Sequence, residues 1–458
     1  MRSQTLLALP FLVACGDSIH VAPDATSDAS TPDTASPDAT SVDDFTLAEQ
    51  MALDRLTPLG AVPADPTNAF ADDARAAALG QMVFFDKSYS GALVVGDDGT
   101  NGGLGVAGET GKVACASCHG VGGAALDDQR SKPNNVSLGT NFTTRNAHGL
   151  VNSAFYAWSN WGGRFDSMWS LPLAVAENGA TLRSTRLQVA HMLFAKYRTE
   201  YDAIFPVALD PALDPNAADA SRFPPIGKPK AAPTDPDGAF ELMTPGDRTI
   251  VNRIFANYGK ALAAYFRTLV SGDAPFDRYV AGDRAAISDS AKRGLHTFLA
   301  RCVGCHDGPT FSDNDFHALG VPQTGLHVPS TDLGRFQDIP PLLASAFNTS
   351  GVFSDDTTTN KLAGLVQQDS QRGQFRTKGL RDVAASGPYM HSGQLATLAD
   401  VVEFYNAGGG DVGSSGVVKD PRIVPLGLDA TQAMDLVEFL TTLTGEPIAA
   451  SRLADTSK

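Results

Sequence analysis

Two pentapeptides carry the clearest chemistry in this sequence. Cys115-Ala116-Ser117-Cys118-His119 and Cys302-Val303-Gly304-Cys305-His306 each place two thiols three positions apart, directly before a histidine. Two thiols at that spacing on a helical turn can form thioethers to the two vinyl-derived carbons of one haem, and the adjacent imidazole can bind its iron. A single such motif also fits a metal or thiol redox site. The pair predicts two covalently bound haem c groups, with His119 and His306 as iron ligands.

The N-terminus reads as an export signal. Arg2 precedes a short apolar stretch, and Leu12-Val13-Ala14-Cys15-Gly16 resembles the bacterial lipobox. Ten apolar residues are too few to span a bilayer. We therefore predict a lipoprotein signal peptide and lipobox in residues 1–15, export, and attachment by lipid at the periplasmic or outer face of a bacterial membrane. An ordinary cleaved signal with an incidental cysteine is the alternative. The other four of the five cysteines are then consumed by the haems.

Composition excludes one class of partner. Acidic residues exceed basic ones by 51 to 35, for a formal charge of −16. Phosphate binding requires a surplus of Lys and Arg, so nucleic acid is not an expected partner. Residues 16–44 contain many Asp, Ser, Thr, Ala and Pro residues and no Lys or Arg, which predicts a disordered acidic tether.

The elements that must position the two motifs are mainly α-helices. Apolar residues recur at three-to-four spacing, and capping residues delimit several runs. The predicted helices are Thr185–Phe205, Asp247–Val270, Asp289–Arg301, Thr397–Asn406 and Asp429–Thr444. A Pro-rich connection at 208–246 separates an N-terminal haem c domain, 45–207, from a C-terminal one, 247–449. No internal repeat is evident beyond the haem motif itself.

From Ala71 to Gly445 the chain resembles the bacterial di-haem cytochrome c peroxidase and MauG family. The segments that carry the resemblance are Arg145-Asn146 through Val151-Asn152, Trp161-Gly162-Gly163-Arg164, Gly308 to Asp313, Phe316-His317, Phe375-Arg376-Thr377, Leu380-Arg381 and Pro388 to Gly393. The resemblance implies a mainly α fold of two cytochrome-c-like helical domains, each holding one c-type haem, with long loops. It also implies one calcium ion at the domain interface.

The resemblance assigns roles to individual residues. Tyr405 falls where the family places the distal ligand of its six-coordinate haem, with Met390 as the alternative ligand and aromatic packing as the alternative role. Trp161 falls at the position of an electron relay between the haems, although core packing alone also explains a tryptophan. Arg164 is then a partner for a haem propionate or a buried carboxylate.

The calcium ligands follow from the same resemblance. Asn146 matches the side-chain ligand, and Ser386 and Pro388 match the two positions that offer main-chain carbonyls. Hard oxygen ligands of this kind suit Ca²⁺.

The distal pocket is where the match weakens. A peroxidatic haem needs a nearby acid-base group, but the Glu and Gln that the family supplies are Thr181 and Leu171 here, and the Asp after the tryptophan is Gly162. Glu177 is a substitute acid-base candidate or a solvated carboxylate. His148 replaces a family Pro and is a candidate distal ligand or proton shuttle, or an ordinary loop histidine.

Two functions follow. In the first, the chain is an enzyme that reduces hydrogen peroxide at the His119 haem. Its electrons come from a small cytochrome or other redox protein through the His306 haem and Trp161, or it oxidises a partner protein in the manner of MauG. In the second, it is a non-catalytic di-haem electron carrier or haem sensor. The whole-chain resemblance favours the first and the missing Glu and Gln favour the second.

Overall fold

The computed structural model describes residues 41–97, 103–120, 136–413 and 416–458. Residues 42–458 form one compact unit. The predicted signal peptide, the lipobox with Cys15 and nearly all of the acidic tether lie outside the described residues. No helix in the described part of the chain is both long and apolar enough to cross a membrane.

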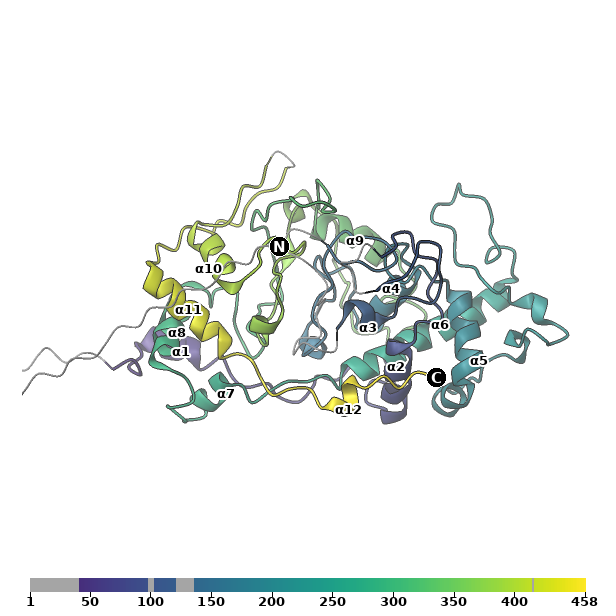
Figure 1. Cartoon of the computed structure of the whole chain (residues 1–458), viewed down its shortest axis with the longest axis horizontal. Helices are drawn as coiled ribbons and strands as arrows, with labels where there is room; N and C mark the ends of the chain where they lie inside the picture. The colour runs from purple at the N-terminus through teal and green to yellow at the C-terminus, as the bar shows by residue number, and fades with distance from the viewer. Residues whose placement is uncertain (1–40, 98–102, 121–135, 414–415) are drawn as a thin grey trace, which may run out of the picture. The chain divides into compact units, whose positions relative to one another are not determined.

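The predicted mainly α fold is confirmed (Figure 1). The helices are α1 Leu47–Leu53, α2 Ala74–Phe85, α3 Cys115–Cys118, α4 Leu171–Glu177, α5 Arg186–Ile204, α6 Pro245–Phe266, α7 Pro275–Val280, α8 Asp289–Arg301, α9 Arg335–Leu343, α10 Leu398–Asn406, α11 Ala430–Thr441 and α12 Ala450–Leu453. Among the described residues the only sheet pairs β1, Phe316–His317, with β2, Phe375–Arg376, in antiparallel register. Long loops join these elements.

Capping residues set the helix starts that the sequence predicts. The Thr397 hydroxyl accepts from the Asp400 main-chain N–H, while the Asp400 carboxylate accepts from the Thr397 N–H, which begins α10. Ser288 caps α8, which has the predicted bounds, and Thr185 caps α5. These local signals are why the five predicted helices are found within a few residues of their expected ends.

Two hydrophobic cores lie under the two haem motifs. In the first, α2 packs along α6, with α4 and α5 beside them; in the second, α8 packs along α11, with α1 and α10 beside them. In Figure 1 the two pairs can be followed as purple against teal and teal against yellow. Each pair crosses at a glycine: a Cβ on Gly80 would lie 2.0 Å from the Ala261 oxygen, and one on Gly294 would lie 1.9 Å from the Asp435 oxygen.

The cores do not follow the predicted domain boundaries residue by residue. Helix α6, which would open the C-terminal domain, contributes its buried residues to the first core. Within 208–246, two 3₁₀ turns form and Leu213, Phe223 and Phe240 are buried against the same core. The division of the chain at residues 208–246 stays a prediction.

Candidate haem sites

A cavity of about 720 Å³ collects most of the predicted site residues. Its size is that of a cofactor site. The predicted haem and calcium residues that line it are Cys302, Cys305, His306, Tyr405, Met390, Trp161, His148, Ser386 and Pro388. The structure thus brings the second motif, both candidate sixth ligands and the candidate relay to one place. The donor set, two thiols, an imidazole and a phenol in one cavity, fits a c-type haem.

Helix α8 and the loop after it present the second motif. Cys302 directly follows α8, and the His306 Nδ1 lies 2.9 Å from the Phe311 carbonyl oxygen. That contact makes Nδ1 the protonated nitrogen and leaves Nε2 with its lone pair for iron. Burial lowers the pKa of His306, so the imidazole stays neutral as a ligand must. Burial also raises the pKa of the Cys302 thiol to about 12, which is unlike a redox-active thiolate.

Tyr405 and Met390 reach the same cavity from different elements. Tyr405 comes from α10, and burial raises the pKa of its phenol. Met390 sits in a tight turn with φ of 69°. Both side chains line the cavity, so the choice of Tyr405 over Met390 as iron ligand stays a prediction.

The first motif forms the short helix α3. Cys115 is buried at its start and His119 follows its end, with the Phe84 ring 6.4 Å and the His148 ring 6.2 Å from the His119 ring, centre to centre. Burial raises the pKa of the Cys115 thiol to about 12. None of the four cysteines in the described residues forms a disulfide, as two thioether-bound haems require.

The structure contains an internal repeat that the sequence analysis missed. Residues 144–165 and 374–395 share several backbone features at positions 230 residues apart, including the 3₁₀ turns Ser153–Phe155 and Val383–Ala385. Antiparallel bridges join Ser159 to Phe165 and Tyr389 to Leu395. Left-handed residues recur at the same places: Asn152 and Asp382 have φ of 60° and 59°, Asn160 and Met390 of 68° and 69°, Gly163 and Gly393 of 65° and 66°.

The repeat is hard to detect in the sequence, because the two copies share few identical residues. The counterparts share Gly149-Leu150 with Gly379-Leu380 and few other identities. Left-handed positions at Asn, Asp and Gly are a usable signal, but Met390 is an uncommon residue for that conformation. At the same offset α4 overlaps α10, although α10 begins three residues earlier.

The two copies exchange matching hydrogen bonds. The Arg376 main-chain N–H donates to the Trp161 carbonyl, and the Asn146 N–H donates to the His391 carbonyl, both at 2.8 Å. Arg376 is the counterpart of Asn146, and His391 is the counterpart of Trp161. The Trp161 and His391 rings lie 6.5 Å apart. The copies are therefore related by a local twofold that passes between Trp161 and His391.

Trp161 is fixed at this junction. Its indole N–H donates to the Asn146 carbonyl at 2.7 Å, and the Lys378 ammonium lies 5.0 Å from the centre of its ring. Because it also lines the cavity, the indole contacts both the first copy of the repeat and the second haem site. Its role as an electron relay between the haems stays a prediction, with core packing as the alternative.

The repeat gives each distal candidate a counterpart. Tyr405 on α10 corresponds to Val175 on α4, which has no metal-binding atom. His148 corresponds to Lys378, whose main chain contacts the imidazole of His306. The His148 ring lies 6.2 Å from the His119 ring, centre to centre, and its role as distal ligand, proton shuttle or loop histidine stays a prediction. Burial, and then the charges of Lys378 and His119, hold the pKa of His148 well below its usual range.

Two predicted site residues, Glu177 and Arg164, lie outside the cavity lining and make other contacts. Both carboxylate oxygens of Glu177 accept from Arg186, at 2.9 and 2.8 Å, in a partly buried ion pair. This pair fixes the carboxylate in place, and the acid-base role of Glu177 stays a prediction. Arg164 is exposed, with its guanidinium 5.9 Å from the Phe165 ring. Neither side chain lines the cavity.

The calcium candidates are linked through the repeat. Asn146 is 6% exposed, and its N–H bonds to His391, three residues after Pro388. Ser386 and Pro388 line the cavity. The structure brings the two segments together without testing an ion there, so calcium stays a proposal.

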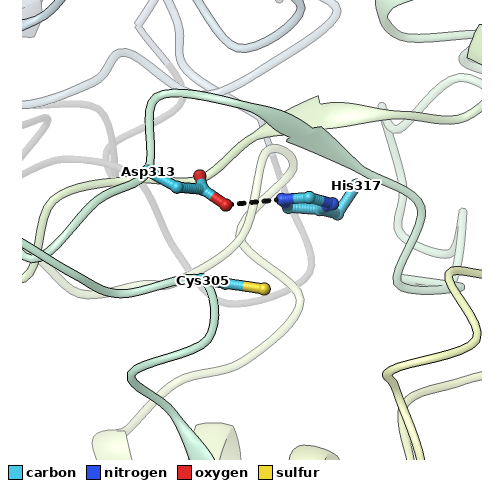
Figure 2. A group of neighbouring side chains, drawn as sticks. All are labelled: Cys305, Asp313 and His317. Atoms are coloured by element: carbon cyan, nitrogen blue, oxygen red, sulfur yellow. Dashed lines mark hydrogen bonds and ion pairs between the residues drawn. The ribbon is translucent and has the colours of Figure 1, made fainter. Parts of the chain in front are cut away.

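A second group of polar side chains lies beside the second motif. Figure 2 shows the Asp313 carboxylate directed at the His317 ring, with the Cys305 sulfur nearby. The His317 Nε2 lies 3.0 Å from Asp313, and its Nδ1 lies 2.8 Å from Asp420, which also pairs with Arg422. Although these atoms could surround a metal ion, Cys305 is committed to thioether chemistry. We assign the group as an ion-pair network that fixes the loop after the motif.

Fold and site together define a class: a mainly helical c-type haem protein with two haem-binding motifs. The model of the family described as di-haem cytochrome c peroxidase matches residues 74–285. The cytochrome-c peroxidase IdrP1 of Denitromonas iodatirespirans is 31% identical over 406 residues, covering 85% of this chain and 86% of that protein. The chain belongs to the di-haem cytochrome c peroxidase family.

Two further likenesses agree with this assignment. The methylamine utilization protein MauG of Methylorubrum extorquens is 37% identical over 191 residues, covering 41% of this chain and 44% of that protein. The crystal structure of a MauG-like protein associated with microbial copper homeostasis has a TM-score of 0.58 at 22% identity. It covers 87% of this chain and 98% of that one, which shows the shared fold. The predicted two c-type haems and the predicted oxidoreductase class are confirmed by the family.

Proposed function

We propose that this chain reduces hydrogen peroxide at the haem bound by His119, with electrons that enter at the haem bound by His306. One observation supports the proposal: Tyr405 lines the cavity of the second motif, and its equivalent in the repeat, on α4, is Val175. A phenol at the cavity wall is a candidate sixth ligand, whereas a valine leaves its position free of any donor. The asymmetry supports a closed electron-entry haem and an open substrate haem.

In this proposal each residue has a separate role. When bound, the haem supplies an iron at which the peroxide O–O bond is cleaved, and each peroxide consumes two electrons and two protons to give two waters. Tyr405 excludes substrate from the second site. Trp161, held by the Asn146 carbonyl at 2.7 Å, lies on the path between the sites. The electrons come from a small cytochrome or another redox protein, or from a partner protein that is oxidised.

A second candidate is a di-haem electron carrier or haem sensor. It is favoured by the distal region, where Thr181 and Leu171 offer no ionisable group. Glu177, the substitute acid-base candidate, is held by Arg186 at 2.8 Å. Peroxide cleavage without a positioned acid-base group is expected to be slower by a factor of about 10²–10⁴.

The test is a reaction of the haem-loaded full-length protein with stoichiometric hydrogen peroxide in a stopped-flow spectrometer, from the di-ferric and the half-reduced states. Rapid changes in the haem absorption bands, with peroxide consumed, support the enzyme. Unchanged spectra in both states would contradict it and leave the electron carrier. Added reduced cytochrome should then be oxidised only if peroxide is turned over.

Two finer assignments belong to the same proposal. We infer one Ca²⁺ held by Asn146 and by the main-chain carbonyls of Ser386 and Pro388, with hard oxygen ligands as support. Removal of calcium by a chelator is expected to change the haem spectra, and re-addition to restore them. We also infer that lipid on Cys15 holds the exported protein at a membrane. Metabolic labelling with a fatty acid should mark the parent protein and not Cys15→Ala.

A further inference from the structure

Arg376 is a buried cation without a counter-ion. Its side chain is in strand β2, lines the cavity and is only 4% exposed. The Nε and Nη1 nitrogens of its guanidinium are buried and have no hydrogen-bond partner. The face of the Tyr156 ring lies 4.3 Å from the guanidinium carbon, which gives a cation–π contact but no acceptor. Burial lowers the pKa of Arg376, as expected where no carboxylate compensates it.

Two other buried arginines near the haem sites are paired with carboxylates, and a third, Arg335, donates to the Gly162 and Gly163 carbonyls. Arg145 binds Asp332 and Asp338, and Arg381 binds both oxygens of Asp277 at 2.8 and 2.9 Å. A buried guanidinium without a hydrogen-bond acceptor or counter-ion is strongly destabilising.

The carboxylates of the cavity wall are engaged elsewhere. Asp332 is taken by Arg145, Asp382 accepts from Ser271 and Gly445, and Asp411 accepts from Gly413. Within the described residues, no side chain therefore supplies the anion that Arg376 requires. The anion must come from what fills the cavity.

We propose that Arg376 binds a propionate carboxylate of the haem attached at Cys302 and Cys305. Propionates are the only anionic groups of a haem, and a guanidinium binds a carboxylate through two parallel hydrogen bonds. The Arg376 N–H donates to the Trp161 carbonyl at 2.8 Å, so the residue that holds the propionate is joined to the candidate relay. Arg376 thus fixes one edge of this haem beside Trp161.

This role has an electrostatic consequence. A fixed positive charge close to the iron favours the reduced, less positive form of the haem. Replacing Arg376 by an uncharged residue should therefore lower the reduction potential of the second haem and leave that of the first nearly unchanged. The inference rests on the bound haem and not on the proposed peroxide chemistry.

The experiment is spectroelectrochemical titration of both haems in the full-length protein, with no peroxide present. In Arg376→Met, the ratio of reduced to oxidised second haem at a fixed potential should fall about tenfold, which is about 59 mV for a one-electron couple. Arg376→Lys keeps the charge and should shift less. Arg372→Met removes a partly exposed arginine that pairs with Asp369 outside the cavity, and should change neither potential.

Haem content, measured as the pyridine haemochrome per protein, accompanies each titration. If Arg376→Met is poorly loaded, Arg376→Gln, which keeps a hydrogen-bond donor but not the charge, is measured by the same criterion. Full loading with both potentials as in the parent would overturn the proposal. A shift of equal size in the Arg372 control would do so as well.

Discussion

The two copies of the loop-and-helix segment, 144–176 and 374–406, share several backbone features and differ in their side chains. Their bridges, 3₁₀ turns and left-handed residues coincide, and they bond to each other through matching N–H groups at 2.8 Å. At equivalent positions the first copy has Asn146, Trp161 and Val175. The second has Arg376, His391 and Tyr405 at those positions.

The difference separates what the backbone does from what the side chains do. In both copies one residue lies near the histidine of a haem motif: His148 near His119 and Lys378 near His306. A second residue from each copy, Trp161 or His391, lies at the local twofold. The side chains then give the two sites unlike chemistry: a cation and a phenol in the second, an amide and an aliphatic group in the first. Divergent side chains on a repeated scaffold would account for the closed and open haem sites of the proposed function.

The most severe test of the comparison is Val175→Tyr, which copies Tyr405 into the first site. If α4 and α10 are equivalent, the new phenol should reach the first haem and abolish its reaction with peroxide. Stopped-flow absorbance on mixing with peroxide measures this. Val175→Phe, of nearly equal size but without the oxygen, should retain more activity than the tyrosine variant. Equal activity in the tyrosine variant and the parent would show that the two helices do not present equivalent faces.

A second test concerns Arg145 and its counterpart Phe375, two equivalent positions with unlike side chains. Arg145 is paired with Asp332 at 2.6 Å and with Asp338 at 2.7 Å, whereas its counterpart Phe375 stacks on His391 at 3.8 Å. Arg145→Met leaves two buried carboxylates unpaired and should cost about 3–5 kcal/mol of unfolding free energy. Phe375→Leu should cost less than about 1.5 kcal/mol. Urea denaturation followed by circular dichroism measures both unfolding free energies. A larger loss of unfolding free energy for Phe375→Leu than for Arg145→Met would contradict the greater structural weight given to the Arg145 ion pairs.

The sequence was informative wherever function or local chemistry sets the residue. The haem motifs, the capped helices α8 and α10 and the shared cavity of the second motif with Tyr405, Met390 and Trp161 could all be predicted. Each depends on a few neighbouring residues or on a family motif.

The repeat, and the position of Arg376 within it, could not be predicted. They depend on backbone dihedral angles that Asn, Asp, Gly and Met adopt alike in this protein, and on hydrogen bonds between segments 230 residues apart. The packing of α6 in the first core was missed for a related reason. Its apolar pattern predicts a buried helix but does not say against which partner it packs.

A third test compares the two cores through their crossing glycines. A methyl group on Gly80 would overlap the Ala261 oxygen, and one on Gly294 would overlap the Asp435 oxygen, at 2.0 and 1.9 Å. Either alanine variant should lose about 1–3 kcal/mol, because overpacking outweighs the gain in helix propensity. Gly246→Ala, in α6 with its nearest contact at 3.8 Å, should gain up to about 1 kcal/mol. Thermal unfolding of the three variants decides whether the two crossings are equally tight.

The smallest expected effect concerns the local twofold itself, where Trp161 faces His391. Trp161→Phe keeps an aromatic ring but removes the N–H that donates to the Asn146 carbonyl at 2.7 Å. Phenylalanine is also harder to oxidise than tryptophan, so electron transfer between the haems should slow about tenfold, or about 1.4 kcal/mol in activation free energy. The rate of redistribution after rapid reduction of the second haem measures it.

The matched control is Trp158→Phe, three residues earlier and outside the cavity lining, which should leave the rate unchanged. Equal slowing in both variants would mean that the loop and not the indole matters. No slowing in either would assign Trp161 to packing at the twofold, because the haems would then exchange electrons without it.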